Sequence, residues 1–454
     1  MNLALNLTIF GGTGDLTFRK LIPALYMMSR TGVLGADSRI LIIGRRPYTS
    51  PQYRLEAEAW VRKFARLKFE EASWQRFVGQ VVYYQMDFTQ PAAYPELGKF
   101  LAQDQIKEHI CYFAVAPRFF GVITTGMEQI PGMERSKIIL EKPFGENLPQ
   151  ARELNAQLEK FVGKDGIYRI DHYLGKDMIR NILTIRFANR LFCENWHCGA
   201  VEGVDVTSVE TTGVEERLEY YDRAGAINDM VQSHLLQMVA LVAMAAPAHL
   251  GPEAIRQAKI DVLRRISVDD RFPPVIGQYR GYDALRPGST IETYVEATLR
   301  IDTVQWQGTR FVVRTGKKLA EKRTEIRLDF RPMRMCPSCA ETIEAPGNRL
   351  TIEVFPKEGM QLRFNSKVPG YGYDLEQVTA DYCHSCRAIG SRPEAYVKLL
   401  KDALAGDHTL FAGFEELREQ WRIADQIRAL AGVNRLIIYP PGTDRVQTHG
   451  ETTC

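Results

Sequence analysis

Residues 169–176 read Arg-Ile-Asp-His-Tyr-Leu-Gly-Lys and place an acid, an imidazole, a phenol and an ammonium within six consecutive positions. His172, Tyr173 and Lys176 can each donate a hydrogen bond to a phosphate group. Asp171 precedes them, and its carboxylate can orient a second imidazole. The segment therefore has the groups to anchor an anionic substrate and to support proton transfer. The alternative is a solvated loop or the start of a helix.

A second cluster of reactive side chains lies between Tyr220 and Gln237. Within it Asp229 and His234 are five residues apart, about 140° around an α-helix, so they need not touch but could line one pocket. Imidazole titrates near neutral pH, which makes His234 the best general base in the chain if Asp171 holds its other ring nitrogen. The alternative is a helical histidine satisfied in the core or at the surface.

The start of the chain has the pattern of a strand, a glycine turn and a helix. Residues 5–10 are apolar and end in Gly11-Gly12-Thr13-Gly14-Asp15-Leu16, after which apolar residues recur at helical spacing. Gly12 and Gly14 let the backbone approach a diphosphate, and Thr17 takes the place of a third glycine or alanine. This pattern predicts a dinucleotide-binding turn, with a purely structural turn as the alternative.

Two arginines follow the next expected strand, residues 39–43. An NAD enzyme commonly has an acid here, whereas Arg45 and Arg46 would bind a 2′-phosphate. NADP is therefore the expected coenzyme, with NAD possible. A solvated turn with two exposed arginines is the alternative.

Another apolar strand, residues 136–140, runs into Glu141-Lys142-Pro143. Lys142 then lies where nicotinamide and sugar would meet, at the carboxyl end of the sheet. The Lys142–Pro143 peptide is a candidate for the cis form, because such bonds persist in tight turns.

The second half of the chain has the alternation of strands in an antiparallel sheet. Residues 201–212 form one such strand with Glu210 near its end, and residues 291–302, 310–314 and 325–330 form others. Between the last two, Lys317 and Lys322 belong to a glycine turn rich in cations that could close on a phosphate. A solubilising loop is the alternative.

Length and composition set the remaining expectations. At 454 residues the chain is longer than one core usually supports, so we expect two domains. Residues 1–170 would form an α/β Rossmann-like NADP-binding domain. Residues 171–454 would form an α+β domain for substrate binding and oligomerisation, with a large, mainly antiparallel sheet and helices. A net charge of +3 favours neither nucleic acid nor a membrane surface as partner, and we expect a cytoplasmic protein because no signal peptide or long apolar run is evident.

Two C-x-x-C pairs stand out among the eight cysteines: Cys336 with Cys339, and Cys383 with Cys386. Four thiolates at this spacing predict a closed tetrahedral zinc site with a structural role. Free thiols and disulfides are the alternatives.

The motifs in series resemble the glucose-6-phosphate dehydrogenase family over nearly the whole chain. The matching segments are residues 11–16, 141–145, 169–176, 229–237, 314–317 and 415–422. The resemblance implies oxidation of glucose 6-phosphate at C1 to 6-phosphogluconolactone, in the oxidative pentose phosphate pathway, with hydride transfer to a nicotinamide coenzyme. It also implies a homodimer or homotetramer formed through the large sheet.

Motif matching implies a role for each site residue. His234 would be the base, oriented by Asp171. The substrate phosphate would be held by His172, Tyr173, Lys176 and Lys317, with assistance from Lys322. Glu210 and Asp229 would bind sugar hydroxyls, and Lys142 would bridge sugar and coenzyme.

Three positions depart from the family pattern. Asn228 stands where arginine is common, Ser233 where asparagine is common, and Phe18 where a basic residue is common. The first and last could alter coenzyme or sugar affinity.

Two other functions fit part of the sequence. A different sugar or polyol dehydrogenase, of the glucose-fructose oxidoreductase type, would leave the cations at Lys176 and Lys317 unexplained. A catalytically silent NADP-binding sensor or scaffold would bind coenzyme without turnover.

Overall fold

The computed structural model describes residues 5–65, 67–103, 109–334, 344–370, 374–384, 386, 395–432 and 436–447. These residues form two compact units. The first comprises the described residues of Met1–Gly175 and Ile389–Phe414, and the second those of Lys176–Ala388 and Glu415–Cys454. The change of unit after Gly175 lies close to the boundary expected after residue 170, but the return of the chain to the first unit was not predicted.

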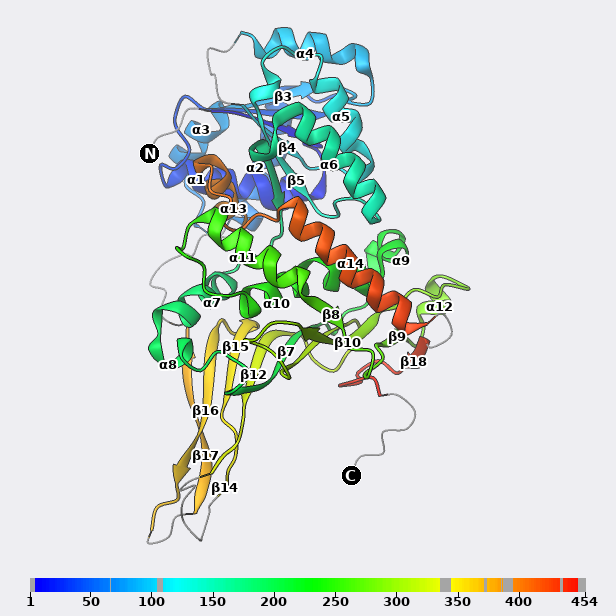
Figure 1. Cartoon of the computed structure of the whole chain (residues 1–454). Helices are drawn as coiled ribbons and strands as arrows, with labels where there is room; N and C mark the ends of the chain where they lie inside the picture. Colours follow the sequence, from blue (N-terminus) through cyan, green and yellow to red (C-terminus); the bar gives the residue numbers. More distant parts are fainter. Residues whose placement is uncertain are drawn as a thin grey trace. The chain divides into compact units, whose positions relative to one another are not determined.

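The first unit is built on a parallel sheet with strand order β3-β2-β1-β4-β5-β6. Figure 1 labels β3, β4 and β5 of this sheet. Its strands are β1 (Asn6–Phe10), β2 (Arg39–Gly44), β3 (Val81–Gln85), β4 (His109–Phe113), β5 (Lys137–Glu141) and β6 (Ile167–Ile170). The central strands are apolar along their length because both faces of the sheet are buried. This strand order is that of a dinucleotide-binding Rossmann fold, as predicted.

Helices and short helical turns connect these strands. They are the π-helical turn η1 (Thr17–Leu21), α1 (Ile22–Arg30), α2 (Ser50–Phe64), α3 (Glu71–Gly79), α4 (Tyr94–Leu101), α5 (Phe120–Met127) and α6 (Leu148–Val162). Two helices, α2 and α3, lie between β2 and β3. Between α2 and α3 the backbone of Glu70 is bound by Tyr26, whose phenol lies 3.1 Å from the Glu70 amide.

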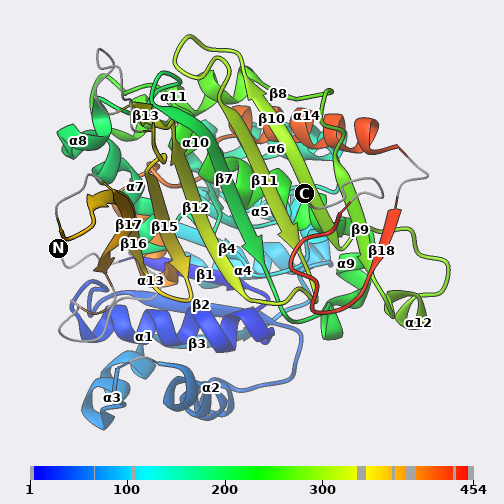
Figure 2. The same ribbon diagram turned by 90° about the horizontal axis from the view of Figure 1, so that it is seen from below.

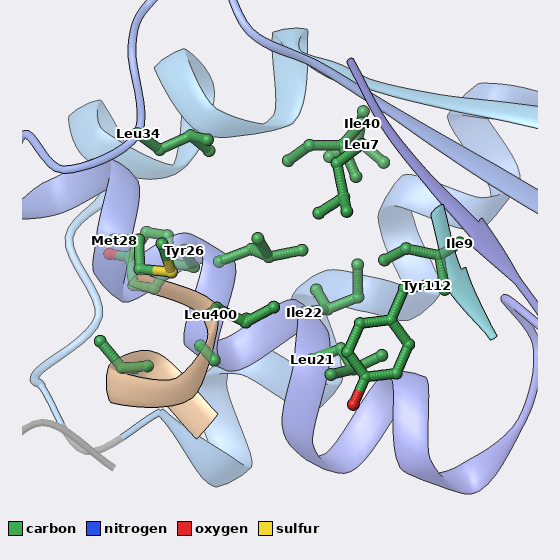
Figure 3. Close-up of a cluster of buried hydrophobic side chains, with 14 of the residues drawn as sticks. Leu7, Ile9, Leu21, Ile22, Tyr26, Met28, Leu34, Ile40, Tyr112 and Leu400 are labelled. Atoms are coloured by element: carbon green, nitrogen blue, oxygen red, sulfur yellow. The ribbon is translucent and has the colours of Figure 1, made fainter. Parts of the chain in front are cut away.

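The core of this unit includes residues from the end of the chain. Helix α13 (Ala395–Ala405) packs against α1, and Leu400 points into the same cluster as Leu7, Ile9 and Ile22 (Figure 3). The segment after α13 covers the edge strand β6.

Specific contacts hold that segment in place. The rings of His408 and Tyr168 stack with centroids 4.0 Å apart, and the amide of Ala412 donates to the carbonyl of Arg169 at 3.2 Å. The returning segment therefore supports the strand that leads into Asp171.

The second unit is built on a large mixed sheet, with strand order β17-β16-β15-β12-β7-β11-β10-β9-β18 and β8 beside β10. Its strands are β7 (Val201–Val209), β8 (Ile266–Val268), β9 (Val275–Tyr279), β10 (Tyr294–Ile301), β11 (Arg310–Gly316), β12 (Arg323–Phe330), β15 (Arg349–Phe355), β16 (Gly359–Lys367), β17 (Leu375–Cys383) and β18 (Leu436–Tyr439). Strands β7 and β11 run parallel, as do β9 and β18, and the other pairs are antiparallel. The predicted mainly antiparallel sheet is confirmed.

Helices cover one face of this sheet. Figure 2 shows α7, α10, α11 and α14 behind the strands. The helices of this unit are α7 (Asp177–Ala188), α8 (Arg190–Cys193), α9 (Leu218–Ala226), the π-helix η7 (Ile227–Leu235), α10 (Leu236–Ala243), α11 (Pro252–Arg264), α12 (Tyr282–Leu285) and α14 (Phe414–Ala431). None of the described helices combines the length and apolar character needed to cross a bilayer.

Candidate active site

The glycine turn after β1 leaves no room for a side chain at Gly11 or Gly12. Gly11 has a φ of 88°, and a Cβ there would lie 2.3 Å from the carbonyl oxygen of Ala114. A Cβ on Gly12 would lie 2.0 Å from the side chain of Ile42. The backbone of the turn is therefore not covered by side chains at these two positions, and the turn leads directly into a helical segment. This is the arrangement that binds a diphosphate. These residues fit a dinucleotide coenzyme.

The other residues of the turn hold its shape. Gly14 donates its amide to the carbonyl of Gly11 at 3.0 Å, and the Thr17 hydroxyl donates to the same carbonyl at 3.0 Å. Thr17 thus replaces a third glycine with a side chain that bonds the turn from inside. Thr13 is half-buried, Leu16 packs against the core, and Asp15 is exposed.

The paired arginines follow β2, as predicted. Arg45 and Arg46 are both exposed, so both guanidinium groups are accessible to an anion. Arg46 donates to the phenol of Tyr48 at 3.3 Å, and this hydrogen bond raises the pKa of Arg46.

The end of β5 carries a buried acid beside Lys142. The Lys142–Pro143 peptide is cis, which confirms the prediction. Glu141 accepts hydrogen bonds from Tyr112 on β4 and Tyr396 on α13. Burial raises the pKa of Glu141, although both phenols oppose the change. Sequence reasoning did not include Glu141 among the site residues. Its position next to Lys142 at a strand end was the available signal.

The segment after β6 folds into a tight turn around Asp171. One carboxylate oxygen of Asp171 accepts the amide of Tyr173 at 2.9 Å, and its carbonyl accepts the amide of Leu174 at 3.0 Å. Asp171 is buried, whereas His172 and Tyr173 are half-buried and their rings meet edge to face, 4.9 Å apart. Lys176, also half-buried, is the first residue of the second unit.

In the second unit, Asp229 and His234 belong to the π-helix η7. Hydrogen bonds in a π-helix join residues five apart, so residue i+5 lies one turn above residue i. The separation of about 140° assumed an α-helix and is wrong for this segment. Both side chains are buried, and Asp229 accepts the phenol of Tyr220 at 3.2 Å and lies 3.6 Å from Arg217.

The parallel strands β7 and β11 bring a second group together. Val209 pairs with Gly316 in the sheet, so Glu210 and Lys317 leave the sheet side by side. Their side chains form an ion pair, and Lys322 lies 3.9 Å from the Glu210 carboxylate. The ammonium of Lys317 also lies 5.5 Å from the ring centroid of Tyr221.

These two groups of the second unit converge. Helix η7 packs against both β7 and β11. The buried phenol of Tyr221 interacts electrostatically with both Asp229 and Glu210. Two acids and two cations thus gather at one end of the sheet, beside the helix that carries His234.

Side chains fix both ends of the continuous helical segment 227–243, in which α10 directly follows the π-helix that carries His234. At the start, the Glu292 carboxylate accepts the amide of Ile227 at 2.9 Å. A Cβ on Gly225, where φ is 63°, would lie 2.3 Å from that carboxylate. Burial raises the pKa of Glu292, and the amide of Ile227 acts against this.

At the other end, three side chains bind the last carbonyls of α10. Arg186 donates to the carbonyls of Leu241 at 2.6 Å and Met244 at 2.7 Å. The indole of Trp196 donates to the carbonyl of Val242 at 2.8 Å, and the indole of Trp306 donates to the carbonyl of Ala243 at 2.7 Å. The carbonyls that a helix end usually leaves to water are therefore bonded inside the protein.

The three departures from the family pattern have identifiable partners. Asn228 accepts a hydrogen bond from Arg428, so α14 supplies a guanidinium at this position. The Ser233 hydroxyl lies 3.4 Å from the Asp229 carbonyl. Phe18 is buried and stacks on Tyr53, which makes it part of the core.

The zinc prediction requires a correction. Cys383 and Cys386 form a disulfide, which removes the two thiolates that would bind the metal. A disulfide was one of the stated alternatives. Cys336 and Cys339 lie outside the described residues.

The predicted residues thus fall into two groups, one in each unit. Asp171, His172, Tyr173 and Lys142 follow the carboxyl ends of neighbouring strands in the sheet that carries the glycine turn. Glu210, Asp229, His234, Lys317 and Lys322 belong to the second unit. The pairing of Asp171 with His234 joins residues of different units and stays a prediction.

A Rossmann sheet with a bare glycine turn, together with a second unit that presents an imidazole among acids and lysines, defines a dinucleotide-dependent oxidoreductase. Residues 8–181 match the family model of the glucose-6-phosphate dehydrogenase NAD binding domain, and residues 183–452 match that of the glucose-6-phosphate dehydrogenase C-terminal domain. The chain belongs to the glucose-6-phosphate dehydrogenase family.

Individual relatives agree with the family models. The chain is 36% identical to glucose-6-phosphate 1-dehydrogenase of Bacillus subtilis, with 95% of this chain and 92% of the relative covered. It is 34% identical to the enzyme of Borreliella burgdorferi, with 93% and 91% covered. A solved glucose-6-phosphate dehydrogenase in complex with its substrate glucose-6-phosphate has a TM-score of 0.90 at 30% identity, covering 100% of this chain and 99% of the other.

Proposed function

We propose that this chain oxidises glucose 6-phosphate at C1 to 6-phosphogluconolactone and passes the hydride to NADP. The observation that carries the proposal is the gathering of Glu210, Lys317 and Lys322 beside the helix that holds Asp229 and His234. A phosphorylated sugar needs cations at its phosphate and a base at its reacting hydroxyl, and this group has both.

His234 acts as the general base in this proposal. It removes the proton of the C1 hydroxyl while the hydride leaves, and imidazole is the side chain most often used for such proton transfer. Asp171 orients the imidazole and stabilises its cationic form. The buried anchors at both ends of the helix limit the movement of His234.

The substrate is held at both ends. His172, Tyr173, Lys176 and Lys317 bind the phosphate with assistance from Lys322, far from the reacting carbon. Glu210 and Asp229 accept hydrogen bonds from sugar hydroxyls. Binding energy gained at the phosphate then fixes the geometry at C1.

The coenzyme site lies in the first unit. The turn at Gly11, Gly12, Thr13, Gly14, Asp15 and Leu16 holds the diphosphate, and Arg45 and Arg46 bind the 2′-phosphate, which favours NADP over NAD. Lys142 bridges coenzyme and sugar. NADP, when bound, supplies the acceptor of the hydride.

Initial rates at the absorbance of the reduced nicotinamide test the proposal. With glucose 6-phosphate, we expect turnover with NADP at least as good as with NAD, and a loss of about 10²- to 10⁴-fold in His234→Ala. The exposed His249 provides the control, and His249→Ala should keep the parent rate. Coenzyme binding without turnover would indicate a sensor. Equal rates with glucose and glucose 6-phosphate would indicate a different sugar dehydrogenase.

A double-mutant cycle tests the pairing of Asp171 with His234. If the acid acts through the base, Asp171→Asn lowers kcat in the parent but has little further effect in His234→Ala. Independent, multiplicative losses would contradict the pairing.

We also propose that the chain forms a homodimer or homotetramer through the large sheet. Arg327 and Asp329 alternate with buried Ile326 and Leu328 on β12, so they point to the opposite face of the sheet from these core residues. Ion pairs link them to Asp205 on β7 and Arg349 on β15. Sedimentation equilibrium tests this, and a monomer at micromolar concentration would contradict it.

A further inference from the structure

Two buried tyrosines hydrogen-bond to the two loops of the first unit that we propose bind the coenzyme. Tyr53 on α2 donates its phenol to the carbonyl of Gly12 in the glycine turn, at 2.8 Å. Tyr83 on β3 donates its phenol to the carbonyl of Arg46, at 2.7 Å. The two rings stack with centroids 5.2 Å apart. The stacked pair of Tyr53 and Tyr83 therefore hydrogen-bonds to the backbone of both loops.

The fit around Tyr83 is close. A Cβ on Gly44 would lie 2.7 Å from the Tyr83 phenol oxygen and 3.0 Å from the side chain of Thr13. The hydroxyl of Ser50 accepts the amide of Tyr83 at 3.0 Å, which fixes the strand against the start of α2. The phenol thus has a defined position, and so does the Arg46 carbonyl it bonds.

A third tyrosine extends this contact to the guanidinium. The ring of Tyr48 meets the ring of Tyr83 edge to face at 5.7 Å, and its phenol oxygen accepts the hydrogen bond from Arg46 at 3.3 Å. Arg46 is therefore held at its carbonyl by Tyr83 and at its side chain by Tyr48, although it lies at the surface. Holding a long side chain in advance reduces the entropy lost when it binds an anion.

The opposite side of the stack is also supported. Phe18 stacks on Tyr53 at 5.3 Å and on Trp60 at 5.8 Å. The aromatic residue at a position that is commonly basic in the family therefore backs the tyrosine that bonds the glycine turn. Burial raises the pKa of Tyr83 to about 12 and raises that of Tyr53 as well, so both phenols remain protonated donors at working pH.

We propose that Tyr83 and Tyr48 are specificity-determining positioning residues that aim Arg46 at the 2′-phosphate of NADP, whereas Tyr53 holds the turn for the diphosphate that NADP and NAD share. The inference rests on the proposed use of NADP. It adds that the preference for NADP over NAD depends on the buried phenol of Tyr83 as well as on Arg46 itself.

Two small probes separate these roles without turnover. Adenosine 2′,5′-bisphosphate carries the 2′-phosphate, and AMP lacks it, so the ratio of their affinities measures recognition of that group alone. Affinities are measured by calorimetry on the full chain. Tyr83→Phe and Tyr48→Phe keep each ring and remove one hydrogen bond, and each should weaken the bisphosphate about three- to tenfold while leaving AMP unchanged.

Tyr53→Phe and Tyr84→Phe complete the design. Tyr53→Phe should weaken both probes by a similar factor, because its carbonyl partner lies in the shared diphosphate turn. Tyr84 is the next residue on β3 and its ring lies near Phe100, 5.0 Å away, so Tyr84→Phe should change neither affinity. A loss of fold stability would alter both probes together and leave their ratio unchanged.

Each result decides the inference. An unchanged affinity ratio in Tyr83→Phe and Tyr48→Phe would overturn it while leaving the NADP preference of the parent intact. A parent that binds both probes equally would overturn the proposed coenzyme preference and this inference together. Turnover of glucose 6-phosphate is scored separately, so a failed reaction would not be mistaken for either.

Discussion

Asp229 and His234 lie one turn apart in a π-helix, and both side chains are buried in the same unit as Lys317. A regular α-helix would turn these two residues away from each other. The wider turn instead lets one short segment present an acid and an imidazole on the same side. π-Helical turns are rare and occur frequently at functional sites.

The first prediction concerns Asp229. Asp229→Asn should lower kcat/KM for glucose 6-phosphate about 10- to 100-fold, since a charge-assisted hydrogen bond to a sugar hydroxyl becomes a neutral one. NADP affinity should not change, because the glycine turn lies in the other unit. Asp222→Asn is the control: Asp222 also accepts a tyrosine phenol, that of Tyr282 at 3.2 Å, so the variant should lose stability but not kcat/KM. Equal kinetic losses in both variants would contradict the assignment.

The second prediction concerns the phosphate end of the substrate. Lys317→Met should raise KM for glucose 6-phosphate about 10- to 100-fold, because a hydrogen bond to a charged group is lost. The rate with unphosphorylated glucose should hardly change. Lys318, the next residue, pairs with Glu215 at 3.6 Å and is more than a third exposed. Lys318→Met should therefore behave like the parent, and a parallel rise in KM for both sugars in Lys317→Met would argue against phosphate binding.

The third prediction concerns the end of the helix that carries His234. Arg186→Met should destabilise the fold by about 2–4 kcal/mol, because two buried carbonyls lose their donor. Arg190 lies only a few residues after Arg186 and forms an exposed ion pair with Glu194. Arg190→Met should therefore lower the free energy of unfolding by about 1 kcal/mol or less. Denaturant unfolding of both variants measures the difference. Similar losses would show that the buried donor is not the anchor.

The fourth prediction concerns acid stability. Burial raises the pKa of Glu296, but hydrogen bonds and charges from Arg445 and Arg314 more than offset this, so the folded pKa lies below the ordinary 4.5. The unfolded chain then binds the proton first, and the contribution of Glu296 to stability is lost as pH falls from about 4.5 through the folded pKa.

A matched pair of variants checks this sign. Glu296→Gln should be less stable than the parent at neutral pH, and the difference should shrink as the pH drops below about 4.5. Glu202→Gln, at an exposed position on β7, should follow the parent at every pH. A constant difference between Glu296→Gln and the parent would mean that ionisation of Glu296 does not contribute.

Much of the fold was predictable because it follows local patterns. The apolar run before Gly11, the apolar run at residues 39–43 and the alternation at residues 325–330 each predicted a strand that the structure contains. The cis peptide at Lys142 was predictable because cis bonds to proline persist in tight turns.

Other features depend on contacts between distant residues. Hydrophobic periodicity indicates a helix at Ile227–Leu235 but does not separate α from π geometry, so the relation of Asp229 to His234 was missed. The local sequence does not distinguish Glu141 from a solvated acid, because Tyr396, which hydrogen-bonds to it, comes from the far end of the chain. The partners that hold Arg46 come from β3 and the loop after β2, and spacing alone does not reveal them.

The late return of the chain to its first unit bears on biosynthesis. Leu399 and Leu400, together with Val397, Ala403 and Phe411, complete a core whose other members leave the ribosome long before them. However early its sheet forms, the first unit cannot finish packing until this late segment of the polypeptide has been made. A premature stop before α13 would therefore damage the half of the enzyme that had already been made.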